Sequence, residues 1–198
     1  MSRRLVAITG GCGFIGRHLA RALSLAGWRT RLIDTALPES RAFPWGLGGV
    51  ADWEFARGDV TDREGLSRIL TDAEAIVHLA GISVARRWQD RPLEAFRVNA
   101  LGTANVVDAG AATRARRVVL ASSRHVEVAS AAGWLDVYAA SKAVAETWVR
   151  ATGHVVARFD NVYGPGQAPG AVIPDFIVRG LAGGYPYGHP KGETVPLL

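Results

Sequence analysis

Tyr138 and Lys142 are four residues apart in a stretch with helical periodicity, so their side chains share one face of a helix, about one turn apart. A free tyrosine has a pKa of about 10 and is a poor base at neutral pH. Lowering that pKa by about 3 takes roughly 4 kcal/mol of phenolate stabilisation, and a neighbouring ammonium in a water-poor cleft supplies part of it. The pair predicts a phenolate base that removes a proton from a substrate hydroxyl.

Two features of the surrounding sequence favour this chemistry over an exposed helix pair. The chain contains 21 arginines and 2 lysines, yet it has lysine at position 142, where the bulkier guanidinium could not deprotonate. Just upstream, the apolar run 118–121 ends in Ser122 and Ser123, at the edge where a substrate oxygen needs a hydrogen-bond donor. We predict Ser123, Tyr138 and Lys142 as catalytic residues and Ser122 as a structural one.

A glycine-rich turn at 9–16 predicts a site for the pyrophosphate of a dinucleotide. It follows the apolar run 5–8 and opens a stretch with helical periodicity, which is the strand–turn–helix order of such sites. The glycines permit a tight turn, a close approach to the phosphates and close helix–strand packing, while free N–H groups and the helix dipole face the negative charge. The residues predicted to contact the cofactor here are Gly10, Gly13, Phe14, Ile15 and Gly16.

Asp34 predicts which dinucleotide is bound. It ends the second strand-like run 18 residues after Gly16, where a carboxylate accepts hydrogen bonds from the ribose hydroxyls of NAD and repels the 2′-phosphate of NADP. Arg31 and Arg41 are near enough in sequence to favour NADP instead, but Arg31 lies within the strand and Arg41 follows a proline-containing loop, so we predict NAD. The positive nicotinamide ring then adds to the stabilisation of the phenolate, and the hydride leaves the substrate carbon for that ring.

The pattern of the whole chain predicts a scaffold that brings these residues together. Strand-like runs are expected at 4–9, 29–34, 53–57, 75–80, 116–122 and 154–159, and helices at 14–26, 62–70, 92–112 and 138–152. Gly27 is expected to end the first helix, and Thr61 or Asp62 to cap the next. This alternation predicts an α/β fold, a Rossmann-type doubly wound parallel sheet with helices on both faces. Ligands of such sheets bind beyond the carboxyl ends of the strands, where the candidate residues lie.

The composition is that of a globular protein and excludes several classes. Of 198 residues, 48% are hydrophobic and 21% charged, a composition that argues against a disordered chain. The net charge of +5 comes from scattered arginines without an RNA-binding or recognition-helix motif, so we predict no nucleic-acid partner and attribute the charge to anionic small molecules. No apolar window is long enough for a membrane span, and Cys12 is the single cysteine; both predict a cytoplasmic protein without membrane contact.

Taken together, these motifs identify a resemblance to extended short-chain dehydrogenase/reductases of the NAD-dependent epimerase/dehydratase family. The resemblance runs from residue 4 to about 166 and rests on motifs in a specific order. They are the glycine turn 9–16, Asp34, Gly58-Asp59-Val60, His78-Leu79-Ala80-Gly81, the run 98–103 with Asn99, Ser122-Ser123, Tyr138-x-x-x-Lys142, and the run 158–165 with Asn161.

The resemblance implies further roles for residues of these motifs. Cofactor contacts are implied for Asp59 and Val60 at the adenine, for Leu79, Ala80 and Gly81 along the ribose and pyrophosphate, for Asn99 in the strand-end network, and for Tyr138 and Lys142 at the nicotinamide ribose. Substrate contacts are implied for Ser123 and Asn161. Purely structural roles remain as alternatives for three residues: Asp59 as a turn residue, Asn99 as a helix-packing residue, and His78 as a strand histidine with its hydrogen bonds satisfied. For His78 we prefer the structural role.

The sequence departs from the family in three places. The segment between Ser123 and Tyr138 is short. The residues at 124–127 match neither the acidic pair of sugar 4,6-dehydratases, which disfavours dehydration, nor the Val-Tyr-Gly of many epimerases. The run 123–126 is slightly similar to uronate dehydrogenases, and Arg124 would pair with a substrate carboxylate there, although a surface role explains it equally well. Beyond residue 166 the substrate-binding lobe of the family is largely missing, and a helix is expected to begin near residue 171.

We therefore expect a NAD-binding Rossmann domain at 1–166 and the start of an incomplete substrate-binding lobe at 167–198. The predicted function is NAD-dependent hydride transfer at a sugar carbinol, foremost as a nucleotide-sugar epimerase. A net sugar or uronate dehydrogenase and a non-catalytic NAD-binding sensor or scaffold are the alternatives. No metal site is predicted. A homodimer built from the helices at 92–112 and 138–152 is the family precedent.

Overall fold

The computed structural model describes residues 4–35, 52–82, 91–113, 115–133, 136–167, 170 and 172–182. Two compact units make up the chain, Met1–Val162 and Tyr163–Leu198. The boundary lies close to the one expected between a cofactor domain and a second lobe. The assignment of the second unit to a substrate-binding lobe stays a prediction.

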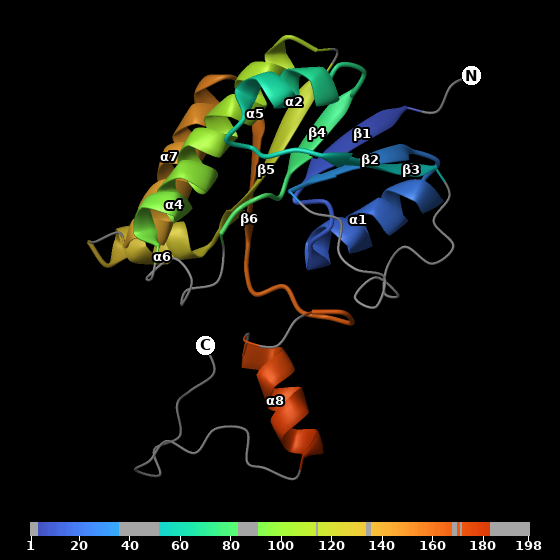
Figure 1. Ribbon diagram of the computed structural model, residues 1–198. Helices are drawn as coiled ribbons and strands as arrows, with labels where there is room; N and C mark the ends of the chain where they lie inside the picture. The colour runs from blue at the N-terminus through green and yellow to red at the C-terminus, as the bar shows by residue number, and fades with distance from the viewer. Residues whose placement is uncertain are drawn as a thin grey trace. The chain divides into compact units, whose positions relative to one another are not determined.

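The first unit is built on a six-stranded parallel sheet in the order β3-β2-β1-β4-β5-β6 (Figure 1). The strands are β1 (Leu5–Thr9), β2 (Arg29–Asp34), β3 (Trp53–Arg57), β4 (Ala75–His78), β5 (Arg117–Ser123) and β6 (Val155–Phe159). The chain moves outward in one direction from β1 to β3 and in the other from β4 to β6. The predicted doubly wound fold is therefore confirmed, with its topological switch point between β1 and β4.

Helices cover both faces of this sheet (Figure 1). They are α1 (Phe14–Leu25), α2 (Arg63–Ile69), α4 (Pro92–Phe96), the π-helix η2 (Arg97–Leu101), α5 (Gly102–Ala111), α6 (His125–Ala131) and α7 (Val137–Ala151). Side chains alternate along β1: Val6 and Ile8 pack with Leu32 and Ala20 in the cluster beneath α1, and Ala7 faces the opposite cluster. β1 is buried along its whole length because both faces of the sheet are covered there.

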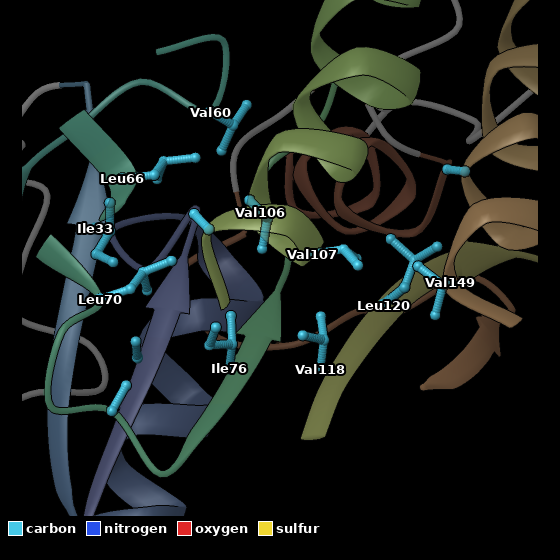
Figure 2. Close-up of a cluster of buried hydrophobic side chains, with 14 residues drawn as sticks. Ile33, Val60, Leu66, Leu70, Ile76, Val106, Val107, Val118, Leu120 and Val149 are labelled. Carbon is cyan, nitrogen blue, oxygen red and sulfur yellow. The ribbon is translucent and has the colours of Figure 1, made fainter. Parts of the chain in front are cut away.

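The larger core lies between the sheet and helices α2, α5 and α7 (Figure 2). Ile33, Ile76 and Leu120 come from the strands and are at most 1% exposed. Leu66 of α2 and Val106 of α5 meet them from the helical side and are fully buried. This core holds the strand ends, and thus the candidate residues, in fixed relative positions.

Local signals explain most of the helix ends. Asp62 caps α2, since its side chain accepts from Gly65 N at 3.0 Å. Ala26 is the C-cap of α1, and Gly27 follows it with φ +83°. This left-handed conformation is the one in which a glycine commonly ends a helix.

Two helical segments differ from the sequence prediction. The helix expected at 92–112 is divided into α4, η2 and α5, with the π-turn around Asn99. Helix α6 (His125–Ala131) occupies a segment for which no helix was predicted. Seven residues, most of them small, give too short a pattern for a periodicity to be recognised.

The second unit contains α8 (Val172–Leu181), close to where a helix was expected. Gly170 N donates to Asp175 Oδ1 at 2.8 Å, which satisfies the backbone just before this helix. Among the described residues, no helix is both long and apolar enough to cross a bilayer.

Candidate active site

The glycine turn after β1 is compact because three of its glycines, Gly10, Gly11 and Gly16, have no room for a side chain. Gly10 has φ +65°, and a Cβ there would lie 2.7 Å from Ala80 N, two residues after β4. A Cβ on Gly16 would lie 2.5 Å from Gly11 O, so α1 could not approach the turn. The turn is thus fixed between β1 and β4, at the switch point where such sheets bind dinucleotides.

Gly13 differs from these glycines because a Cβ there would meet only one neighbouring atom, at a tight but less prohibitive distance. It is exposed, and the one heavy atom near its Cβ position is Gly10 O, at 3.1 Å. It is also the N-cap of α1, with no side-chain cap hydrogen bond and no acidic residue in the first turn of the helix. These features fit a pyrophosphate, whose charge is stabilised by the first N–H groups and the dipole of a 12-residue helix.

Asp34 lies at the end of β2 beside this turn. Its Oδ2 accepts from Cys12 N at 3.2 Å, and its Oδ1 accepts from Thr35 N at 2.9 Å. Burial raises the pKa of Asp34 above its ordinary value despite these two donors. The carboxylate is therefore oriented by the backbone of the glycine turn itself, as a ribose ligand would need.

Arg31 does not lie free beside Asp34. Its guanidinium donates to Glu54 Oε1 and Asp72 Oδ1, both at 2.6 Å, and to Ile69 O at 2.5 Å. The argument that Arg31 accommodates a 2′-phosphate is weakened accordingly. Arg41 lies outside the described residues.

His78 at the end of β4 is a structural histidine in this arrangement. It is 1% exposed, and its Nδ1 and Nε2 are 2.6 Å from Thr9 Oγ1 and 3.0 Å from Thr103 Oγ1. Thr103 Oγ1 donates to Asn99 O, so the proton of the imidazole is assigned to Nε2. Burial, and to a smaller extent the charge of Lys142, lowers the pKa of His78 to about 3. The structure supports the structural role of His78 over a catalytic one.

This histidine should make the fold sensitive to acid. Because its folded pKa of about 3 lies below its unfolded value of about 6.5, the unfolded state binds more protons between these pH values. We expect the free energy of unfolding to fall by about 2 kcal/mol from pH 6.5 to 4.5 through this residue alone. Urea unfolding at several pH values would measure it, and His78→Gln should show a flatter profile. An equally steep profile in both proteins would contradict the assignment.

Asn99 fixes the segment that follows β4. It is 1% exposed; its Oδ1 accepts from Ile82 N at 2.9 Å, and its Nδ2 donates to Ile82 O at 3.2 Å and to Ser141 Oγ at 3.1 Å. A Cβ on Gly81 would come within 3.0 Å of Asn99 Oδ1 and 3.2 Å of Lys142 Nζ. Asn99 therefore connects the β4 edge with α7, and Gly81 lies directly beside the Lys142 ammonium.

Ser123 and Tyr138 are brought together across the end of β5. The Tyr138 hydroxyl is hydrogen bonded to Ser123, whose Oγ also accepts from His125 N at 3.1 Å. Asp136 caps α7 by accepting from Ala139 N at 2.7 Å, which fixes the first turn of the helix that carries Tyr138. The sequence placed these two residues 15 apart, and the fold makes them neighbours.

The electrostatics of Tyr138 differ from the expectation. Burial raises its pKa above 10, Asp136 adds to the rise, and the Ser123 hydrogen bond opposes it. Lys142 Nζ donates instead to Ala121 O at 3.0 Å, and burial lowers the pKa of Lys142 to about 8. This environment favours the phenol over the phenolate, because burial disfavours the anion and the Ser123 hydroxyl offsets that effect only in part.

The remaining predicted residues divide between edge and core. Arg124, implied at a substrate carboxylate, lies 3.3 Å from Asp160 in an exposed ion pair, and Asn161 follows exposed at the end of β6. Asp59 accepts from Thr61 N and Oγ1, both at 2.8 Å, as a turn residue does. The Val60 side chain is buried in the core.

One residue of this edge escaped the sequence analysis. Glu146 is 2% exposed on α7 and accepts hydrogen bonds from Ser122 and Arg158. It comes four residues after Lys142, so the spacing that linked Tyr138 with Lys142 would have extended to it.

Comparisons with known proteins fit this geometry. Residues 6–193 match the NAD dependent epimerase/dehydratase family. A ceramide reductase from Caulobacter vibrioides is 36% identical over 172 residues, which are 84% of this chain and 49% of that protein. A UDP-glucose 4-epimerase from Bos taurus is 30% identical over 131 residues, 61% of this chain and 38% of that protein. The crystal structure of a dTDP-glucose 4,6-dehydratase from Streptomyces venezuelae with NAD bound has a TM-score of 0.76 at 30% identity, covering 91% of this chain and 63% of that one. The chain thus spans about half the length of the first of these relatives.

Proposed function

Because this chain belongs to the NAD-dependent epimerase/dehydratase family, we propose that it carries out hydride transfer at a sugar carbinol, foremost as an epimerase acting on a nucleotide sugar. The family is NAD-dependent, and NAD supplies a ring carbon that accepts and returns a hydride. The observation that carries the proposal is the hydrogen-bonded Ser123–Tyr138 pair beside the buried Lys142, at the same strand edge as the glycine turn.

The residues of the chain divide the work as follows. Gly13 and the start of α1 hold the pyrophosphate, and Asp34 accepts hydrogen bonds from the ribose hydroxyls. Ser123 donates a hydrogen bond to the reacting substrate oxygen. Tyr138 removes the proton of that substrate hydroxyl once the phenolate of Tyr138 is stabilised. Lys142, mostly protonated at pH 7, lies beside Gly81, where it supplies positive charge and donors.

A net oxidoreductase is the second candidate, and the similarity to a ceramide reductase supports it. In a net reaction NADH accumulates or is consumed, whereas an epimerase reduces and reoxidises its cofactor within one turnover. For either reaction we propose the cytoplasm as the location, since a single cysteine is typical of a reducing compartment.

The experiment that tests the function is a calorimetric titration with NAD and NADP, followed by a panel of UDP- and dTDP-sugars and free uronates. Sugar isomerisation without new absorbance near 340 nm supports the epimerase, and accumulating NADH supports the dehydrogenase. NAD binding without turnover on any of the panel would support a sensor or scaffold role. Failure to bind either dinucleotide would contradict all three.

The cofactor preference should depend on the charge of Asp34. In Asp34→Asn, the loss of the carboxylate should weaken NAD binding about tenfold and bring NADP binding closer to it, because a hydrogen bond to a charged group is worth about 1.5–3 kcal/mol. Calorimetry on both dinucleotides measures the ratio. Asp108→Asn, at an exposed carboxylate that pairs with Arg63, is the matched control and should keep the preference. An unchanged ratio in Asp34→Asn would remove this residue from the cofactor site.

We also propose that the chain forms a homodimer through α4, η2 and α7, which are neighbours in the fold (Figure 1). Exposed apolar side chains on them include Leu93, 74% exposed, and Trp148, 50% exposed, with Phe96, Leu101 and Val144. Sedimentation velocity at about 50 μM should give twice the chain mass, and Trp148→Glu should give a monomer. A monomeric wild-type protein at that concentration would contradict this interface.

A further inference from the structure

Tyr138, Lys142 and Glu146 form a polar row along α7. They are spaced four residues apart, so three successive helical turns carry them on one face. Their partners are three consecutive residues of β5, in the range 121–123. The contacts are Tyr138 hydroxyl with Ser123, Lys142 Nζ with Ala121 O at 3.0 Å, and Glu146 Oε1 with Ser122 Oγ at 2.6 Å. Every turn of this part of α7 is therefore attached to the strand that carries Ser123.

Glu146 is held as an anion although it is buried. Arg158 donates to it through Nε at 2.9 Å and through Nη2 at 2.8 Å, and Arg150 Nη2 lies 3.0 Å from Oε2. Arg158 lies opposite Ser122 in the β5–β6 pairing, so the carboxylate joins both strands to α7. Burial alone would raise the pKa of Glu146, but these donors hold it below its ordinary value.

Lys142 is 6% exposed and needs a nearby negative charge to remain protonated. From β4 it faces His78, which is neutral at pH 7, and from β5 it faces the Ala121 carbonyl. The Asn99 amide of η2 also lies near Lys142, because Asn99 Oδ1 and Lys142 Nζ both lie next to Gly81. The fixed charge that favours its protonated form is Glu146, which opposes the lowering of the Lys142 pKa by burial.

We propose that Glu146 is a positioning residue: clamped by Arg158, it keeps the Lys142 ammonium charged and sets the register of Tyr138 against Ser123. The inference rests on the proposed function for its catalytic meaning and on these contacts alone for its electrostatics. It also predicts opposite effects for the two members of the clamp. Removing the Glu146 charge disfavours a charged Lys142, whereas removing the Arg158 charge favours it, because Arg150 and Ser122 still hold the carboxylate.

The composition of the chain makes Lys142 directly observable. The full chain has two lysines, Lys142 and Lys191, so protein labelled with [ε-¹³C]lysine gives two side-chain NMR signals. Lys191→Arg assigns them. The wild-type Lys142 signal should titrate near pH 8, as its pKa of about 8 requires. In Glu146→Gln, Lys142 should bind its proton about tenfold more weakly than in the wild type. In Arg158→Gln, Lys142 should bind its proton more tightly. Glu127→Gln, an exposed partner of Arg158, is the control and should leave the midpoint near 8.

Opposite shifts in Glu146→Gln and Arg158→Gln support the inference. Shifts of the same sign, or no shift in either, overturn it, since a purely structural clamp would loosen the site in the same way from both sides. If Glu146→Gln does not fold, Arg158→Gln decides: tighter proton binding supports the inference and weaker or equal binding overturns it. The titration needs neither NAD nor substrate, so it stands even if the proposed function fails. Loss of turnover in Tyr138→Phe with no coupling at Lys142 would overturn the inference alone.

Discussion

Replacing Tyr138 with phenylalanine should reduce turnover by about 1,000-fold while NAD affinity stays within about twofold. The substitution removes the hydroxyl that is hydrogen bonded to Ser123 and keeps the aromatic ring, whose centroid lies 6.0 Å from that of His125. Because the lost group acts on the proton of the substrate hydroxyl, the rate of chemistry should fall and cofactor binding should not. Stopped-flow measurement of cofactor reduction, on the substrate that the panel identifies, gives the rate, and calorimetry gives the affinity.

Tyr163→Phe is the matched control for this variant, because it removes the same hydroxyl from a side chain that is 63% exposed. Its turnover should match wild type. If Tyr138→Phe retained more than about a tenth of the wild-type rate, another group would have to be the base. An equal loss in both variants would point to a nonspecific effect of the substitution.

Replacing Gly13 with valine should weaken NAD binding at least about 100-fold, equivalent to about 2.7 kcal/mol, without unfolding the protein. Gly13 has φ −70° and ψ 174°, a conformation open to any residue, and its Cβ position is close to Gly10 O alone. The valine methyl groups would occupy the space that the phosphates need in front of α1. Calorimetry measures the affinity, and thermal unfolding should show a midpoint within a few degrees of wild type.

Two further glycines make this test specific. Gly180→Val, in the open surroundings of α8, should leave NAD affinity unchanged. Gly10→Val should fail in the fold itself, because φ is +65° and the Cβ would lie 2.7 Å from Ala80 N. If Gly13→Val bound NAD normally, the pyrophosphate would not lie at this turn.

Much of the fold and several site elements could be predicted from the residues in order. The doubly wound sheet follows from alternating patterns that are buried on both faces, and the glycine turn follows from spacing that a tight strand–turn–helix connection requires. Tyr138 and Lys142 could be paired because helical geometry is regular over four residues. Asp34 could be placed beside the turn because adjacent parallel strands end at the same edge.

The electrostatic state of the site could not be predicted in this way. A periodic pattern does not reveal that Lys142 donates to Ala121 or that burial raises the pKa of Tyr138, since both depend on which groups exclude water from the helix–strand contact. The π-turn at Asn99 and the short helix α6 were missed for a similar reason. Such segments are chosen by the contacts they make, as Asn99 does with Ile82 and Ser141, rather than by local preference.

The sequence by itself determined the class of sheet, the position of the glycine turn and the residues that can do chemistry, because these depend on periodicity and spacing along one chain. The tertiary structure alone decided that His78 is a neutral structural residue, that Asp59 closes a turn, and that Glu146 joins two strands to the helix of Tyr138. The physical reason is that charge, hydrogen bonding and burial are properties of neighbours in space. Residues 24 positions apart, such as Ser122 and Glu146, become neighbours only when the core has packed α7 onto β5.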